Sequence, residues 1–192
     1  MTRIISMLIV LMSCQAIGAD KNGQFAIKGV GNVGCKSYVS IIQSNNQQKY
    51  LFAGWLNGFI TSHNQHLIDT FDLTSWENVE TLGNYMYQHC ILNTEKSFFQ
   101  AATDMVTKLG TEKIDLYKSA VTFSANSKTY VVYDQVVMRM KQKLSDLNIF
   151  SGDINAEITT NFKDAVKTYA HNTDIEIESI FDQQLLFKMF HG

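Results

Sequence analysis

Two cysteines, Cys35 and Cys90, bracket the most strongly helical stretch of the chain. Within it, apolar side chains recur three, four and five positions apart at Leu51, Phe52, Trp55, Leu56, Phe59 and Ile60. On a helix these side chains form one wide apolar stripe with Trp55 at its centre. Gly54 and Gly58 stand one turn apart beside the stripe, where the lack of side chains would let another backbone approach closely. The pattern therefore predicts a core helix with a cysteine on either side that could tie its neighbours together.

The amino terminus has the three parts of an export signal. Arg3 supplies a positive charge, Ile4 to Met12 form an apolar run, and Ala16 to Ala19 offer small residues for signal peptidase. We therefore expect residues 1–19 to be a signal peptide and the mature protein to be exported to the periplasm or the medium. The apolar run is far shorter than the roughly 20 residues that span a bilayer, so we expect no transmembrane segment.

Removal of the signal also removes Cys14, which leaves Cys35 and Cys90 as a pair. An even pair in an exported protein predicts a disulfide, and the chain-entropy model values a loop of this length at about 4 kcal/mol. Two buried free thiols are the alternative. A metal site is disfavoured, because neither cysteine has a second Cys or His at ligand spacing. Residues 11–14 loosely resemble a lipobox, so lipidation of Cys14 is a further alternative.

Helical spacing continues along the rest of the chain. In the first half it predicts helices near residues 35–43, 50–67, 76–90 and 98–109. Thr74 and Glu77 are spaced as a capping box for the third of these, and Asn93 or Thr94 would cap the fourth. We expect residues 20–110 to form a disulfide-stapled helical domain.

Residues 111–192 are expected to form a helical C-terminal extension or subdomain. Val132, Val136, Met140 and Leu144 favour a helix from about 129 to 147, a second should begin at Gly152, and Thr173 with Glu176 would cap a third. Residues 119–123 and 129–133 are also β-prone, so a small β-hairpin near 119–133 is the alternative there. The predicted fold class is mainly α, a helical bundle with one disulfide.

Composition and motifs exclude some functions. The formal net charge of -2 gives no basic excess for nucleic acid. Gly29, Gly31 and Gly34 match the spacing of a dinucleotide fingerprint, but no strand precedes them and no βαβ pattern follows, so we expect no cofactor. No catalytic motif is recognisable, which disfavours an enzyme without excluding one.

Two clusters of polar residues are candidates for binding. His63 and His66 could share a helix face, but two histidines without a third ligand make only a weak candidate metal site, and none is expected. The positively charged residues Lys128, Arg139, Lys141 and Lys143 could hold anionic, phosphorylated lipid head groups. Their alternative role is the ordinary polar face of an amphipathic helix.

The first half of the chain also resembles a known class of proteins. The resemblance covers about residues 29–110. It is carried by a cysteine that opens a short helix, by Trp55-Leu-Asn-Gly-Phe-Ile-Thr-Ser-His-Asn64, and by Tyr-Met-Tyr-Gln-His-Cys90 followed by an Ala-containing helix that ends at Leu109. It is similar to small exported helical bacterial domains, namely immunity proteins against type VI secretion toxins and, more distantly, periplasmic chaperones of the HdeA type.

The resemblance implies a disulfide-stapled bundle that works by binding, with Trp55, Gly54, Gly58, Phe59 and Asn64 as its core motif. The chain departs from the pattern in lacking proline after Cys90 and in carrying residues 111–192. We therefore expect an exported, non-enzymatic protein that sequesters a protein partner. The alternative is a secreted virulence-type effector that engages host protein or anionic lipid through its C-terminal helices.

Overall fold

The computed structural model describes residues 19–192. The expected signal peptide, apart from Ala19, and the lipidation candidate Cys14 lie outside the described residues. Within the described range the chain is mainly helical, with one small antiparallel hairpin, which confirms the predicted fold class. Its elements are η1 (Gly29–Asn32), α1 (Cys35–Gln43), α2 (Lys49–His66), α3 (Val79–Leu92), α4 (Phe98–Leu109), β1 (Ala120–Ala125), β2 (Lys128–Tyr133), α5 (Asp134–Asp146), α6 (Thr160–Asn172) and α7 (Gln183–His191).

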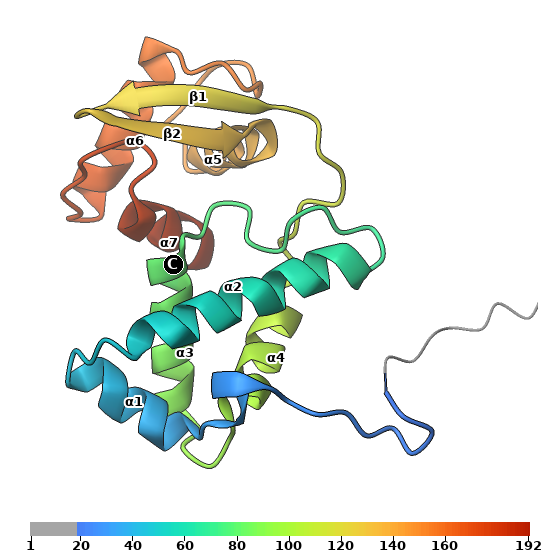
Figure 1. Ribbon diagram of the computed structural model, residues 1–192. Helices are drawn as coiled ribbons and strands as arrows, with labels where there is room; N and C mark the ends of the chain where they lie inside the picture. Colours follow the sequence, from blue (N-terminus) through green and yellow to red (C-terminus); the bar gives the residue numbers. More distant parts are fainter. Residues whose placement is uncertain (1–18) are drawn as a thin grey trace, which may run out of the picture.

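These elements form two lobes, each around its own apolar core (Figure 1). The first lobe contains η1 and α1 to α4, and the second contains the hairpin and α5 to α7. Tyr85 of α3 contacts both cores, and Trp76, although it precedes α3 in sequence, belongs to the core of the second lobe. The carboxyl terminus lies at the junction of the lobes. The segment before α3 and the end of the chain therefore hold the two lobes together.

The core of the first lobe is built from aromatic side chains and the disulfide. Phe98 of α4 is 1% exposed, and its ring centroid lies 4.8 Å from that of Tyr38 on α1 and 4.8 Å from that of Phe52 on α2. Cys35 and Cys90 form a disulfide that joins the start of α1 to α3, and both residues are fully buried. The prediction of this bond from the paired cysteines is confirmed.

The stripe of α2 is narrower than its sequence pattern suggests. Phe52, Leu56 and Ile60 are buried, whereas Trp55 and Phe59 are partly buried and Leu51 is 62% exposed. The buried line of the helix therefore runs through Leu56 and not through Trp55.

Gly54 and Gly58 lie on the solvent side of α2, and a Cβ atom built at either would meet nothing within 4 Å. The prediction that another backbone approaches there is wrong. The close approach occurs at Gly31 of η1, where a Cβ atom would lie 2.8 Å from Cε2 of Trp55 and 2.8 Å from Cγ2 of Ile27. Trp55 completes the contact by donating its indole N–H to the Lys28 carbonyl at 2.9 Å.

Substitution of Gly31 by alanine should lower the free energy of unfolding by about 2 kcal/mol, because the added methyl group overpacks a rigid indole ring. Gly58→Ala is the matched control. It fills open space in a helix, where alanine is favoured over glycine by up to about 1 kcal/mol. Urea unfolding followed by tryptophan fluorescence measures both changes. Equal stability of the two variants would contradict the assigned contact between Gly31 and Trp55.

The second lobe begins with the hairpin, and here the predicted helix over 129–133 is wrong. β1 and β2 pair antiparallel with Ala125 opposite Lys128, and the two residues between them, Asn126 and Ser127, have φ values of 49° and 61°. A two-residue loop with positive φ at both positions is the turn that best matches strand twist. The helix with Val136, Met140 and Leu144 therefore starts only at Asp134.

Several helices begin later than their sequence patterns predict. Thr74 does not cap α3, because its hydroxyl donates to Asp72; Asn78 caps the helix by accepting from the Thr81 N–H at 2.8 Å. Ser97, rather than Asn93 or Thr94, caps α4 and forms a capping box with Gln100. Thr159 caps α6 and Asp182 caps α7, so the predicted starts at Gly152 and at the Thr173 and Glu176 box are also wrong.

Candidate functional site

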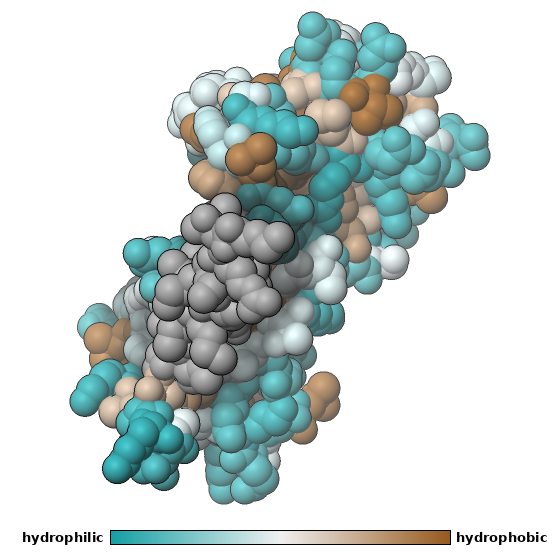
Figure 2. Space-filling view, turned by 90° about the vertical axis from the view of Figure 1, so that its right-hand side faces the viewer, coloured by the Kyte–Doolittle hydropathy of each residue, from teal (hydrophilic) through white to brown (hydrophobic). Residues whose placement is uncertain are grey.

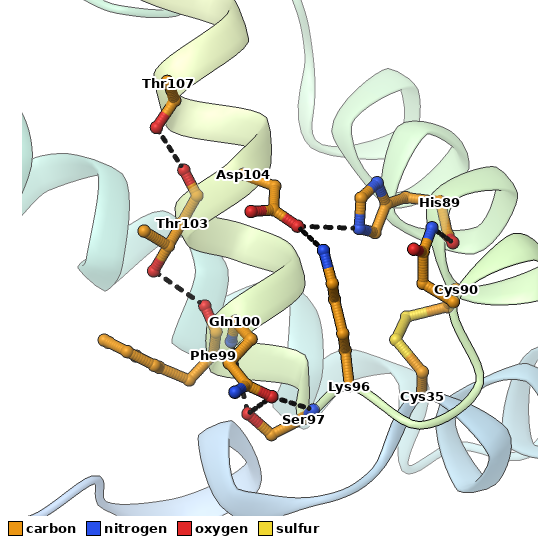
Figure 3. A network of polar contacts seen from close by, with 11 residues as sticks. Cys35, His89, Cys90, Lys96, Ser97, Phe99, Gln100, Thr103, Asp104 and Thr107 are labelled. Carbon is orange, nitrogen blue, oxygen red and sulfur yellow. Dashed lines mark hydrogen bonds and ion pairs between the residues drawn. A yellow bond between two sulfur atoms is a disulfide. The ribbon is translucent and has the colours of Figure 1, made fainter.

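The disulfide is surrounded by polar contacts that fix the connection between α3 and α4 (Figure 3). Asp104 of α4 accepts a hydrogen bond from Lys96 and lies 3.1 Å from Nε2 of His89. The bond from Lys96 and the positive charges of Lys96 and His89 lower the pKa of the Asp104 carboxyl. The Asp104 side chain is 42% exposed, and its carboxylate joins α4 to His89 at the end of α3 and to Lys96 in the connection between the two helices. We therefore interpret these contacts as structural and not as a binding site.

Asn64 joins the end of α2 to the segment before α3. Its side-chain oxygen accepts from the Leu73 N–H at 3.0 Å, and its amide donates to Asp72 at 3.2 Å. The other carboxyl oxygen of Asp72 accepts from the Tyr133 hydroxyl of β2 at 3.0 Å. Asn64, predicted as part of the core motif, thus orients a carboxylate that links the two lobes.

The imidazole rings of His63 and His66 contact backbone carbonyl groups of α2, the helix that carries them. Nδ1 of each lies within 2.8 Å of the carbonyl oxygen four residues earlier, that of Phe59 or Ser62 respectively. In residues 19–192 no group of three or more His, Cys, Asp or Glu side chains could hold a metal ion. In the same range no helix is long and apolar enough to cross a membrane.

The four predicted anion-binding cations do not form one patch. Lys128 on β2 pairs with Glu178 at 2.8 Å, and Arg139 pairs with Glu112 at 2.8 Å while its guanidinium covers the Phe190 ring. Lys141 is 1% exposed and donates to the Asn155 side chain at 2.8 Å. Burial lowers its pKa. Among the described residues, Lys143 is the one of the four that is neither ion-paired nor buried, so the predicted patch for anionic lipid is not assembled.

A groove lies between the two lobes. It consists of two hollows of about 730 Å³ and about 460 Å³, and we call the pair the interlobe groove. The larger hollow lies between α3, β2 and the start of α7. The smaller one lies between β2 and residues 72–77. Tyr130, Phe181 and Gln183 line both hollows, so the two are neighbours.

Gln183 at the start of α7 connects the two lobes beside the groove. Its side-chain oxygen accepts from the Asn78 N–H at 2.9 Å and from the Thr81 hydroxyl at 2.7 Å. Its amide group donates to the Trp76 carbonyl at 2.8 Å. A single side chain thus ties the second lobe to the amino-terminal end of α3, and it fixes the distance between the walls of the groove.

A partly buried polar cluster that is shared by the lobes adjoins the groove. Glu77 is 9% exposed, Arg139 and His191 both approach Glu112, and the rings of Trp76 and Tyr85 face His191 with centroids 5.8 Å and 6.1 Å away. Three of its polar atoms have no hydrogen-bond partner in the described structure: the Trp76 indole nitrogen, the Tyr85 hydroxyl and Nε2 of His191.

The cluster alters the ionisation of its members. Burial raises the pKa of Glu77 to about 7, and the negative charge of Glu112 adds to this effect. Burial and the same carboxylates raise the pKa of Tyr85, whereas burial lowers the pKa of His191. A carboxyl group that changes charge near neutral pH therefore sits where the two lobes meet.

Of the residues that line the groove, the sequence patterns indicate only Lys128 as a candidate for binding. Nothing in the spacing of Trp76 and Tyr85 along the sequence indicates that they reach a second core. The spacing of Glu77 from Thr74 predicts a capping box and not a buried carboxyl group. Gln183 belongs to no sequence motif that predicts a role for it. These residues become a site only through the contact of α7 with α3, which joins positions more than a hundred residues apart.

No family model, curated protein or solved structure matches the chain. The case for its function therefore rests on the groove and on the sequence patterns.

Proposed function

We propose that the protein is exported and acts by binding a segment of a protein partner in the interlobe groove. The observation that carries the proposal is the groove itself, because it lies between two separate cores and is open along the face of α3. Binding sites in proteins are often formed where two such bodies meet.

The lining of the larger hollow suits a peptide. The lining combines aromatic rings with side-chain amides: the rings are those of Tyr85, Tyr130, Phe181 and Phe187, and the amides are those of Asn78, Asn84, Gln88, Gln183 and Gln184. Aromatic side chains supply contact area, and amides can pair with the peptide groups of a partner. Phe187 is 44% exposed although its ring centroid lies 5.7 Å from that of Tyr85, so its free face is available to a ligand.

Charge favours a basic or neutral partner. The two hollows are lined by Asp72, Glu77, Glu80, Glu178 and Asp182, against Lys128 alone, which is itself paired with Glu178. Such a groove repels phosphorylated lipid and nucleic acid and attracts lysine and arginine side chains. The alternative of a secreted effector that binds anionic lipid gains no support, because three of the four cations proposed for it are paired or buried.

The proposal also includes export of the protein and masking of its partner. The disulfide fits an oxidising compartment, and the amino-terminal pattern fits a signal peptide. The visible face of the molecule is mostly hydrophilic, with apolar residues scattered over it (Figure 2). This face therefore gives no separate reason to place the partner on it. Masking of a toxin or client is the role that the resemblance to immunity proteins and HdeA-type chaperones implies.

Site-specific crosslinking tests this proposal. A photoreactive amino acid at the exposed position Gln88 should form an adduct with one protein from the exported fraction, and its crosslinked peptide should carry lysine or arginine. The same group at Leu92, 83% exposed at the far end of α3, is the matched control.

Phe187→Ala should reduce the Gln88 adduct about tenfold, which corresponds to loss of one aromatic contact of about 1.4 kcal/mol. Leu92→Ala should leave it unchanged. Equal adducts from Gln88 and Leu92, or an adduct that Phe187→Ala does not alter, would contradict binding in the groove. An adduct with lipid alone would support the effector alternative.

A further inference from the structure

The hairpin leaves one of its strand edges open to the interlobe groove. Outside the hairpin, Asp134 N–H donates to the Ser119 carbonyl, and hydrogen-bonded pairs alternate along an antiparallel ladder from there. Val121 opposite Val132 and Phe123 opposite Tyr130 are therefore the bonded pairs. The backbone groups of Thr129 and Val131 point away from β1, and beyond the hairpin neither makes a backbone hydrogen bond to the rest of the described chain.

This open edge faces the other wall of the groove. Val131, Val132 and Tyr133 line the smaller hollow together with Thr74, Ser75 and Trp76. In Figure 1, β2 lies between β1 and the segment that joins α2 to α3. The open edge is thus bordered by a hollow, which Gln183 and Leu186 of α7 also line. Val131 is 71% exposed, which is unusual for a β-branched apolar side chain beside an uncovered edge.

The groove also supplies pockets along the same line. Tyr130 and Phe181 contribute to both hollows, so a chain that follows β2 would pass from one hollow to the other. Alternate side chains of an added strand point to opposite faces, and those that enter the groove would meet aromatic rings and carboxylates. The excess of acidic side chains over the single, already paired Lys128 selects basic residues at these positions.

We propose that the partner segment binds as an extended strand that adds to the free edge of β2 and alternates basic with apolar side chains. The proposal rests on the proposed function, because it describes how the groove holds its partner. Main-chain hydrogen bonds to Thr129 and Val131 supply affinity. The carboxylates of the two hollows select basic side chains on the face that enters the groove, and the exposed side chain of Val131 favours apolar ones on the other face.

A defined peptide tests strand addition without knowledge of the natural partner. The probe is a fluorescent peptide as long as β2 in which lysine and valine alternate, measured by anisotropy with the full mature chain. It should bind at least tenfold more tightly than the peptide in which glutamate replaces lysine. N-methylation of every second peptide bond on one edge should abolish binding, because it removes the N–H groups that pair with β2.

Two proline variants locate the edge. Val131→Pro removes the outward N–H of β2 and should weaken binding of the lysine–valine peptide at least tenfold. Its cross-strand partner Thr122 is also exposed and carries an outward N–H on the opposite edge, so Thr122→Pro is the matched control and should bind normally. Proline is tolerated at such edge positions, and circular dichroism checks that both variants fold.

The outcomes separate strand addition from binding in the groove. If the lysine–valine peptide does not bind, or binds both proline variants or its N-methylated form equally well, strand addition is overturned. A partner adduct at Gln88 that still depends on Phe187 would then leave the proposed function intact. Self-association of the chain that Val131→Pro abolishes would assign the edge to a second copy and would also overturn the proposal.

Discussion

Replacement of both Cys35 and Cys90 by alanine should lower the free energy of unfolding of the first lobe by about 4 kcal/mol. The bond joins residues 55 positions apart, and the chain-entropy model assigns a loop of this length about that value. Both residues are fully buried and belong to the first core, so the bond also joins α1 to α3 at the centre of packing. Reduction of the unmodified protein should have a similar effect.

The two tryptophans make the effect measurable lobe by lobe. Trp55 packs against the core of the first lobe and Trp76 lies in the core of the second. In a Trp76→Phe background, urea unfolding monitored by Trp55 should shift to much lower urea when the disulfide is absent. In a Trp55→Phe background, the Trp76 transition should shift less, because the second core contains neither cysteine.

An equal shift of both transitions would show that the lobes unfold as one unit. No shift at Trp55 would contradict the stabilising role of the disulfide.

Replacement of Glu77 by glutamine should stabilise the protein above neutral pH by about 3 kcal/mol. The ordinary pKa of 4.5 is raised to about 7 in the folded protein, chiefly because the carboxyl group is buried, and each pKa unit corresponds to about 1.4 kcal/mol. Glutamine has a similar shape and can still accept the hydrogen bond that the Trp76 N–H donates to the Glu77 carboxyl at 3.3 Å.

The sign follows from proton linkage. Below about pH 4.5 the carboxyl is protonated in the folded and unfolded states, so Glu77→Gln should leave stability nearly unchanged. Between about pH 4.5 and 7 the folded protein retains a proton that the unfolded chain has released, and its stability therefore falls as the pH rises. Above about pH 7 the full cost of the buried charge is present, and the glutamine variant avoids it.

Thermal and urea unfolding at pH 4, 6 and 8 measures this difference. Other charged groups facing Glu77 are Glu112 and Arg139. His191, also in the cluster, has a lowered pKa and so favours folding as the pH rises, which is the opposite sense. Glu112, Arg139 and His191 are present in both the unmodified protein and the Glu77→Gln variant. The difference in free energy of unfolding between the two proteins therefore reports on Glu77. Glu80→Gln, at an exposed position of the groove rim, should have little effect. A difference independent of pH would contradict burial of a titrating carboxyl.

Much of the first lobe could be predicted from the sequence. Cysteines with export-like surroundings predicted the disulfide, and apolar spacing located α1, α2 and α4 to within a few residues of their observed ends. These predictions hold because helical periodicity depends on residues close together in the sequence, and because two remaining cysteines allow only one pairing. Capping boxes were less informative, since the hydroxyl of Thr74 is taken by Asp72 and Glu77 is drawn into the junction.

The second lobe shows where local signals compete. Residues 129–133 satisfy both a helical spacing and a β-prone composition, and the two-residue turn at Asn126 and Ser127 decides for the hairpin. The cations on α5 look like a single patch in the sequence. Yet Arg139 and Lys141 are two positions apart on a helix and therefore face different directions, one toward Glu112 and the other into the core.

The sequence by itself determined that the chain is mainly helical and predicted its disulfide, whereas export and action by binding stay predictions. Only the tertiary structure decided that Trp76, Glu77 and Tyr85 meet Arg139, Gln183 and His191, and that β2 leaves an edge open beside them. The reason is physical. Periodicity reports which face of an element is buried, whereas the element it is buried against depends on long-range packing, and the groove exists only between elements that the sequence keeps far apart.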